Sequence, residues 1–564
     1  MAKERINRIE IDWKDLFKPI SGLQTGPTGA RVINEIVVKQ EIIPIIFVPG
    51  IMGSRLKYTK GGARAWDPDG QIFMLNKYGR LYLEPEDRKL NLIGERSHES
   101  NYLSVDNDNA KHNRKLPDGM GRNGWGGVYW GGYGKILKTL AAHSWPEPLN
   151  ACFHFPVYAF GYNWTNCCTE SGGLLARFID QKIKENANQG PCTKVILVTH
   201  SMGGLVARAA CNPKNPDNVK DKVLGIVHGV QPATGAAAAY FRMKTGFEPA
   251  GNPPGTLGGW LQNPLKLSWS KIKGTVGNFV LGNHGEEVTI IMANSPGALE
   301  LLPNKLYKDN SGSAQWLSYT DKLGKRRELP NGDPYSNIYR LKEAVYRLVN
   351  PEWLGQGEKQ KEDELPSGAE PDKWNSYLIN LDYAKDFHEK LADAVHPETY
   401  QFYATGVDTV DRVDIVSRRQ QIKGPLDLEA VLKKKNFTFE IHDEKGNMLV
   451  PDNQAMLGAY VIDAHNTESA DAHDPPEKCI VFSLKPPSGT GDSTVPDSSG
   501  KALKVKASGY TQARDTTVAI NEDDESWYNR KHDSIYNNKT AQHITLKAIE
   551  NLCKYEIKKR TGAA

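Results

Sequence analysis

The sequence contains no long hydrophobic run, little cysteine and no marked excess of charge of either sign. No stretch approaches the roughly 18 apolar residues that a membrane-spanning helix needs. The longest candidate, residues 42–48, has the length of a strand and contains a proline. The 7 cysteines among 564 residues do not indicate a disulfide scaffold, and no CxxC pair indicates a zinc site. The 71 Lys and Arg residues nearly balance the 67 Asp and Glu residues, which argues against nucleic acid as a partner.

The first residues, MAKER, lead into no apolar segment, so the sequence shows no conventional signal peptide. We therefore expect synthesis in the reducing cytoplasm. If the protein acts outside the cell, it must leave by a route that does not read the N-terminus. The composition is that of an ordinary globular protein, with 39% hydrophobic and 24% charged residues. The length allows either one large fold with insertions or two to three domains.

A strand–helix rhythm predicts the α/β fold class, with a mostly parallel, doubly wound sheet. Continuous apolar runs, which are typical of strands buried on both faces, occur at residues 42–48, 195–198 and 223–227. Between the first two runs, apolar residues recur at helical spacing from 174 to 183. Two further strands and a closing amphipathic helix are expected at residues 400–405, 480–484 and 541–557.

The rhythm breaks after residue 230, where glycine, proline, tryptophan and asparagine become frequent. We interpret the chain as one α/β core with two large insertions. The predicted organisation is an N-terminal extension at 1–40, a first part of the core at 41–230, a cap or lid insertion at 231–399, a core strand at 400–406, a second insertion at 407–478 and the last part of the core at 479–564.

The segment KVILVTHSMGGLVAR, residues 194–208, places Ser201 at a sharp turn between a strand and a helix. A nucleophilic serine in such a turn has strained backbone angles and a close strand–helix approach, so small residues must flank it. Gly203 fits the pattern GxSxG, whereas Thr199 stands where a glycine is usual. We expect the neighbouring His200 to pack or hydrogen-bond beneath the turn, because adjacent side chains at a strand end point to opposite sides.

A serine that attacks an ester also needs backbone amides where the oxyanion develops. One is expected at Met202, the first residue of the following helix, where the helix dipole adds to the stabilisation. The second is expected in the loop PGIMGS, residues 49–54, whose glycines allow close approach of the backbone. There we expect the amide of Met52, with that of Ile51 as the alternative.

Several segments carry a family resemblance. FVPGIMGS at 47–54, YAFGYNW at 158–164 and THSMGG at 199–204 resemble, in this order, the lecithin:cholesterol acyltransferase and GPI-inositol-deacylase branch of the α/β-hydrolases. SPGALELLP at 295–303 resembles a segment of the same lipid acyl-hydrolases. Within the branch, HGVQPATGA at 228–236 is most similar to the antibacterial lipase effectors of type VI secretion. The resemblance implies an α/β-hydrolase fold with large cap or lid insertions.

The acid and the base of a triad follow the serine along the chain of this fold, in the order Asp or Glu, then His. GDSTVP at 491–496 resembles the branch's Gly-Asp-Gly-Thr-Val element, which supplies the acid, so Asp492 is the expected acid. Its competitor Asp463, with His465 nearby, lacks the glycine-framed turn. His532, in a polar loop before the last helix, is the expected base, since His543 falls within the periodic pattern of that helix.

The apolar, glycine-punctuated segment that contains Trp260 and Leu261 has two interpretations. It forms either a mobile lid that covers the serine and contacts lipid, or ordinary core of a cap domain. We expect no metal ligands and no cofactor. The run DNDN at 106–109 lacks the glycine and the distal glutamate of an EF-hand, so calcium is not indicated, and only a calcium site of another kind stays open.

The resemblance implies a serine lipase or phospholipase that cuts ester bonds of membrane lipids, delivered as a toxin by type VI secretion into the periplasm of a target cell. Its partners would be lipid at a membrane surface, a delivery component and a cognate immunity protein. One alternative is an intracellular acyl-hydrolase or acyltransferase without a toxic role. Another is a binding protein on a degenerate scaffold, against which the intact Ser201, Asp492 and His532 argue.

Overall fold

The computed structural model describes residues 5–27, 31–78, 85–94, 102–107, 116–117, 120–247, 282, 284–320, 324–355, 373–422, 437–443, 477–505, 507, 516–521 and 527–562. Four residues named above lie outside these ranges: Trp260, Leu261, Asp463 and His465.

Six parallel strands form the central sheet, in the order β20-β14-β11-β10-β4-β9. They are β4 (Ile45–Val48), β9 (Val157–Ala159), β10 (Val195–His200), β11 (Val223–Gly229), β14 (Thr399–Ala404) and β20 (Thr517–Ile520). The first strand of the sheet along the chain is β4. The next, β9, pairs with one edge of β4, and β10, β11, β14 and β20 are then added in this order on the other side. The predicted parallel, doubly wound sheet is therefore confirmed.

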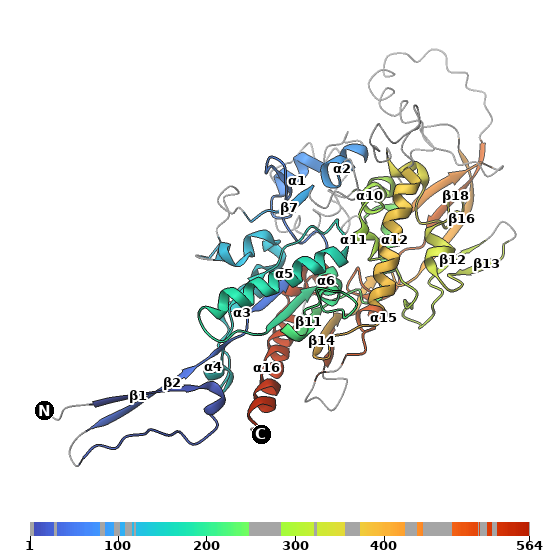
Figure 1. Cartoon of the computed structure of the whole chain (residues 1–564). Coiled ribbons are helices and arrows are strands. Elements are labelled where there is room, and N and C mark those ends of the chain that lie inside the picture. Colours follow the sequence, from blue (N-terminus) through green and yellow to red (C-terminus); the bar gives the residue numbers. More distant parts are fainter. Residues whose placement is uncertain are drawn as a thin grey trace.

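Helices cover both faces of this sheet, and Figure 1 shows α5 and α16 on opposite sides of it. The covering helices are α3 (Trp130–Ala142), α5 (Cys168–Ala187), α6 (Met202–Ala210) and α16 (Lys539–Thr561). In β4, Ile45 and Phe47 pack with α3 and α16, whereas Ile46 and Val48 pack with α5 and α6. A strand between two helical layers needs an apolar residue at every position, which explains the unbroken run in the sequence.

A second sheet, to the right in Figure 1, has the order β13-β12-β16-β18-β17. Its strands are β12 (Leu317–Thr320), β13 (Arg326–Leu329), β16 (Val413–Ile422), β17 (Thr438–His442) and β18 (Glu477–Leu484). We predicted residues 480–484 as a strand of the core, and this prediction is wrong. These residues belong to β18 of the second sheet. Its partners are antiparallel β16 and β17, and the core strand that ends the central sheet is β20.

The helices of the insertion share a hydrophobic core with this second sheet. They are α7 (Ala237–Thr245), α10 (Gly285–Met292), α11 (Pro296–Leu299) and α12 (Lys373–Leu391). A buried ion cluster joins α7 to β17: the Glu440 carboxylate lies 3.4 Å from Lys244 Nζ and 3.0 Å from Arg347 Nη2. Removing one partner of such a buried pair leaves an uncompensated charge, so this cluster stabilises the position of β17 relative to α7.

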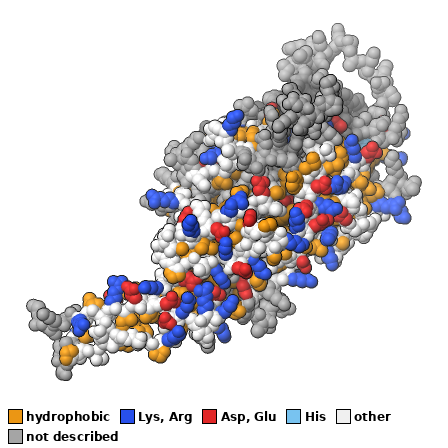
Figure 2. All heavy atoms as spheres, viewed as in Figure 1, with side chains coloured by type: hydrophobic (Ala, Val, Ile, Leu, Met, Phe, Trp, Pro, Cys, Tyr) orange, Lys and Arg blue, Asp and Glu red, His pale blue; other side chains and the backbone are white. Residues whose placement is uncertain are grey.

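The smaller elements lie around the core. β1 (Arg5–Asp12) and β2 (Val32–Lys39) form a parallel ribbon that projects at the lower left of Figure 1. The others are β3 (Glu41–Ile42), β5 (Leu56–Tyr58), β6 (Arg64–Trp66), β7 (Leu103–Val105), β8 (Phe153–His154), β15 (Val407–Thr409), β19 (Gly489–Gly491), α1 (Gln71–Tyr78), α2 (Pro85–Leu92), α4 (Leu149–Cys152) and α15 (Asp497–Gly500). Within the described ranges, no helix has the length and apolar character to cross a membrane. On the face drawn in Figure 2, charges of both signs are interspersed.

Two adjacent glycines of α5 provide a test of the close α5–α6 packing. A Cβ on Gly172 would lie 2.8 Å from the Cβ of Ala209, whereas a Cβ on Gly173 would meet nothing nearer than Arg177 Nη1 at 3.8 Å. We expect Gly172→Ala to lower the free energy of unfolding by about 1–3 kcal/mol through overpacking. Gly173→Ala should raise it by about 0.5–1 kcal/mol, because alanine favours the helix. Urea unfolding of both variants measures the difference, and shifts of the same sign would contradict this packing.

Candidate active site

Ser201 lies between β10 and α6 with φ 52° and ψ −125°. This backbone conformation is unusual for a residue with a side chain and persists only where the surroundings hold it. The Ser201 amide donates a hydrogen bond to the Gly229 carbonyl at 2.9 Å, which ties the turn to the neighbouring strand β11. The strained turn expected at the end of this strand is therefore present.

Glycines around Ser201 make room for this turn. A Cβ on Gly203 would lie 2.4 Å from the carbonyl oxygens of Val48 and Pro49, and a Cβ on Gly50 would lie 3.0 Å from Ser201 Cβ. The loop after β4 thus presses directly on the serine turn. Thr199, which stands where a glycine is usual, places its Oγ1 2.9 Å from Nδ1 of the buried His228. The Thr199 side chain thus forms a buried hydrogen bond that a glycine at this position could not form.

The structure brings Ser201, His532 and Asp492 together. His532 begins the 3-10 helix η9 (His532–Asn537), which precedes α16. Its Nε2 lies 2.7 Å from Ser201 Oγ, and its Nδ1 lies 2.7 Å from Asp492 Oδ2. The serine, the aspartate and the histidine are 3%, 1% and 9% exposed. The three side chains therefore form a hydrogen-bonded series with the histidine in the middle. This is the geometry in which a base lies between a serine hydroxyl and an orienting carboxylate.

Backbone amides hold the Asp492 carboxylate. Its Oδ1 accepts hydrogen bonds from the amides of Thr494 at 3.0 Å and Val495 at 2.7 Å, which leaves Oδ2 to His532. Ser493 replaces the glycine of the resembling motif and has φ 78°. Thr409 Oγ1 accepts from its amide at 2.8 Å, and its carbonyl accepts from Arg242 Nη2 at 3.2 Å. Sequence analysis missed Thr409 and Arg242, because no local motif marks them.

The loop after β4 forms a tight turn beside the serine. The Gly53 amide donates to the Gly50 carbonyl at 3.0 Å, and Met52 has φ 60°. This closing bond does not use the amides of Ile51 and Met52. Trp66 Nε1 donates to the Met52 carbonyl at 3.0 Å, which ties the loop to the buried side chain of Trp66. The Met202 amide is the first of α6, and the first amides of a helix have no partner within it.

His200 lies beneath the turn, as expected from the sequence. Its Nδ1 is 2.9 Å from the Tyr133 hydroxyl, and its Nε2 is 2.8 Å from the His532 carbonyl oxygen. Burial, with a smaller contribution from His532, lowers the pKa of His200 to about 3. The ring is therefore neutral at physiological pH and cannot replace His532 between Ser201 and Asp492.

The segment at 295–303 packs beside the serine turn. A Cβ on Gly297 would lie 2.7 Å from Met202 Cε and 2.8 Å from the Trp164 carbonyl. In the same segment, the buried Glu300 accepts a hydrogen bond from the Cys168 amide at 2.7 Å. Burial raises the pKa of the Glu300 carboxyl above its ordinary value of 4.5. The segment thus joins the first turn of α5 to the residue that follows Ser201.

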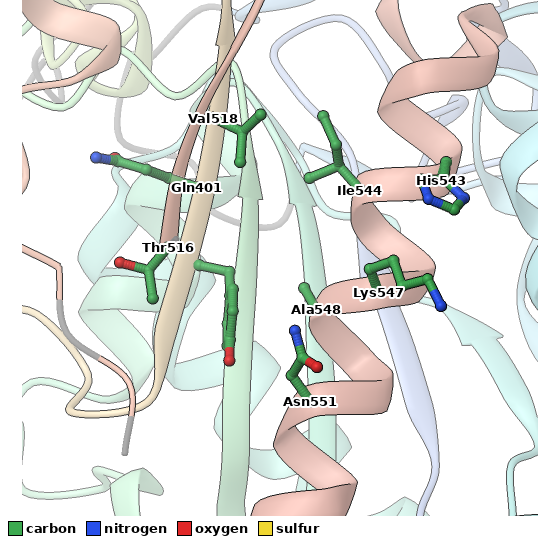
Figure 3. Close-up of a pocket in the computed structure, with 9 residues that line it drawn as sticks. Gln401, Thr516, Val518, His543, Ile544, Lys547, Ala548 and Asn551 are labelled. Carbon is green, nitrogen blue, oxygen red and sulfur yellow. The ribbon is translucent and has the colours of Figure 1, made fainter. Parts of the chain in front are cut away.

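A pocket elsewhere in the molecule does not belong to this site. Figure 3 shows it between α16, which contributes Ile544 and Ala548, and strands β14 and β20, which contribute Gln401 and Val518. No member of the Ser201–His532–Asp492 group lines it. In the part of the chain that the structure describes, no cluster of three His, Cys, Asp or Glu side chains could hold a metal ion.

The fold has relatives among known proteins. Residues 142–245 match the family described as PGAP1-like alpha/beta domain. A chain in the crystal structure of the Tle4–Tli4 complex has a TM-score of 0.59 and 22% identity, over 92% of this chain and 99% of that chain. These findings confirm the predicted α/β-hydrolase fold. No curated protein matches the sequence.

Two further solved structures match weakly. Bacillus licheniformis lipase BlEst2 in its propeptide form is 12% identical, with a TM-score of 0.17, over 80% of this chain and 73% of that chain. Phospholipase PlaB from Legionella pneumophila is 11% identical, with a TM-score of 0.16, over 78% and 81%. Both TM-scores are too low to bear on the fold.

Restoring the usual glycine at position 199 should destabilise the protein. Thr199→Gly removes the partner of His228 Nδ1, and a buried polar group left without a partner costs about 1–3 kcal/mol. Glycine within a strand adds a smaller loss. Thermal and urea unfolding measure the change. Thr199→Ser, which can keep the hydroxyl, is the control and should lose much less. A Thr199→Gly variant as stable as the wild type would contradict this role of the hydrogen bond.

Glu300 should make the stability depend on pH. Because its folded-state pKa is raised, the folded state retains a proton that the unfolded chain loses above pH 4.5, and stability falls as the pH rises toward the raised pKa. We expect Glu300→Gln, which can still accept from Cys168, to lose less stability than the wild type between about pH 5 and pH 8. Glu389→Gln, on the exposed surface of α12, is the control and should follow the wild type. Parallel curves for all three proteins would contradict this assignment.

Proposed function

We propose that this chain is a serine lipase or phospholipase that hydrolyses ester bonds of membrane lipids. The observation that carries the proposal is the unbroken hydrogen-bonded series from Ser201 through His532 to Asp492. The strained turn at Ser201, the match to a PGAP1-like alpha/beta domain and the similarity of the motifs to lipid acyl-hydrolases support it. No step of this chemistry calls for a cofactor.

In the proposed reaction, Ser201 Oγ attacks the ester carbonyl while His532 Nε2 takes its proton. Asp492 holds the Nδ1–H side of the ring and stabilises the imidazolium that forms. The amides of Met202 and Met52, with Ile51 as the alternative to Met52, stabilise the oxyanion. His532 then gives the proton to the leaving alcohol, and the acyl group stays on Ser201. Finally, His532 activates a water molecule that releases the fatty acid.

We further propose that the enzyme is an antibacterial toxin, delivered by type VI secretion into the periplasm of a target cell and neutralised in its producer by an immunity protein. Support comes from the segment at 228–236, which resembles such effectors, and from the shared fold with a chain of the Tle4–Tli4 complex. That structure is a complex of two proteins, which supports a protein partner for this chain as well. A delivery component is the third expected partner, beside the lipid substrate and the immunity protein.

Fatty-acid release from phospholipid micelles tests the chemistry. We expect release by the wild type, none above background by Ser201→Ala, and a loss of about 10⁴-fold in kcat for Asp492→Asn, in which the base is held in the wrong tautomer. Asp497→Asn is the matched control, since Asp497 is a nearby half-buried carboxylate that accepts from Thr405 Oγ1 at 2.7 Å. It should keep most of the activity. Mass spectrometry of the products identifies the acyl position.

The other outcomes separate the parts of the proposal. Hydrolysis of soluble esters without release from micelles would reject phospholipid as the substrate and keep the serine esterase. Transfer of the acyl group to an added alcohol would favour an acyltransferase. Equal activity of wild type and Ser201→Ala would reject the nucleophile. Growth arrest by periplasm-directed wild type, absent with Ser201→Ala, tests the toxic role.

A further inference from the structure

A buried chain of hydrogen bonds runs beneath the active site. The Gly50 amide donates to the Tyr133 hydroxyl at 3.2 Å, and that hydroxyl lies 2.9 Å from His200 Nδ1. His200 Nε2 lies 2.8 Å from the carbonyl oxygen of His532. The chain therefore begins in the loop after β4 and ends on the backbone of the residue that contacts Ser201 Oγ. Both ring-bearing members, Tyr133 and His200, are buried.

The direction of these bonds follows from the acceptor at the end. A carbonyl oxygen only accepts, so His200 Nε2 carries the hydrogen and Nδ1 must accept from Tyr133. The lowered pKa of His200, about 3, agrees with a neutral ring. The groups that face this ring are the Tyr133 hydroxyl, His532 and the aromatic ring of Tyr536. Both ring nitrogens of His200 thus form hydrogen bonds, one as the donor and the other as the acceptor.

Two glycines of the loop after β4 make room for this series of hydrogen bonds. A Cβ on Gly53 would lie 2.6 Å from the Tyr133 hydroxyl, and a Cβ on Gly50 would lie 2.7 Å from His200 Nδ1. Any larger residue would displace the hydroxyl or the ring. Gly50 and Gly53 therefore do more than permit a tight turn. They allow the loop to lie directly on Tyr133 and His200.

We propose that His200 and Tyr133 are positioning residues that set the position of the loop after β4, residues 49–54, relative to His532. The proposal rests on the proposed function. The loop and His532 belong to distant parts of the chain, and the hydrogen-bond chain through these two side chains joins them. Tyr133 positions the loop at Gly50, and His200 positions His532 at its backbone. An error of about 1 Å in such a geometry costs about 10²-fold in rate, so the two residues act on turnover rather than on substrate binding.

Steady-state kinetics on a short soluble ester tests this inference, with active sites counted by stoichiometric phosphonate labelling. We expect Tyr133→Phe, which removes one hydroxyl, to lower kcat per active site by about 10- to 100-fold while KM stays within about twofold. His200→Leu should lose at least as much. His200→Gln, which keeps a donor for the His532 carbonyl, should recover at least about tenfold over His200→Leu.

Tyr377→Phe is the matched control. Tyr377, in α12, is buried and donates to the Tyr339 carbonyl at 2.7 Å, so its variant also loses a buried hydroxyl, although the Tyr133 hydroxyl has two hydrogen-bond partners, Gly50 and His200. We expect Tyr377→Phe to be thermally destabilised as well, but with unchanged kcat per active site. Folded Tyr133→Phe and His200→Leu proteins with the turnover of Tyr377→Phe would overturn the inference. A wild type that neither hydrolyses the ester nor takes the phosphonate would overturn the proposed function instead, which keeps the two failures distinct.

Discussion

The strained backbone at Ser201 is the constraint on which the rest of the site depends. Its φ of 52° holds only because the loop after β4 and the first turn of α6 are pressed together around it. A Cβ on Gly203 would strike the carbonyl oxygens of Val48, the last residue of β4, and of Pro49, the first residue of the loop. The loop also lies against the serine itself, since a Cβ on Gly50 would lie 3.0 Å from Ser201 Cβ. The serine turn and the loop beside it therefore depend on one packing contact, and neither can be moved without the other.

Much of this could be predicted from the sequence because the constraints act locally. A strand between two helical layers must be apolar throughout, and β4 shows this directly. A strained turn must have small neighbours, which marked Ser201 and Gly203. Asp492 was predicted from chain order, its glycine-framed turn and the motif it resembles, and His532 from chain order and its polar loop before the last helix. The structure places His532 in contact with Ser201, and Asp492 in contact with His532. Apart from chain order, each of these signals lies within a few residues of the feature that it predicts.

The remainder could not be predicted, because it depends on contacts between distant segments. Residues 480–484 read equally well as a strand of either sheet, and only the pairing with β16 and β17 assigns them to the second. Thr409 and Arg242 support the strained Ser493 from other parts of the chain, and their own surroundings in the sequence carry no motif. Thr199 looked like a departure from a pattern, whereas its hydroxyl contacts His228, which comes from the next strand. Trp260 and Leu261 stay a prediction.

Burial decides which histidine can serve as a base. A base must take up a proton, and burial opposes the charged form of imidazole. Desolvation lowers the pKa of both His200 and His228 to about 3 and that of His388 to about 4, so these rings stay neutral. His532 differs in its contacts, because its Nδ1 lies 2.7 Å from the Asp492 carboxylate and its Nε2 lies 2.7 Å from Ser201 Oγ. His200 and His532 thus differ in what they contact: His200 is kept neutral and donates to a backbone carbonyl, whereas His532 lies between a serine hydroxyl and a carboxylate.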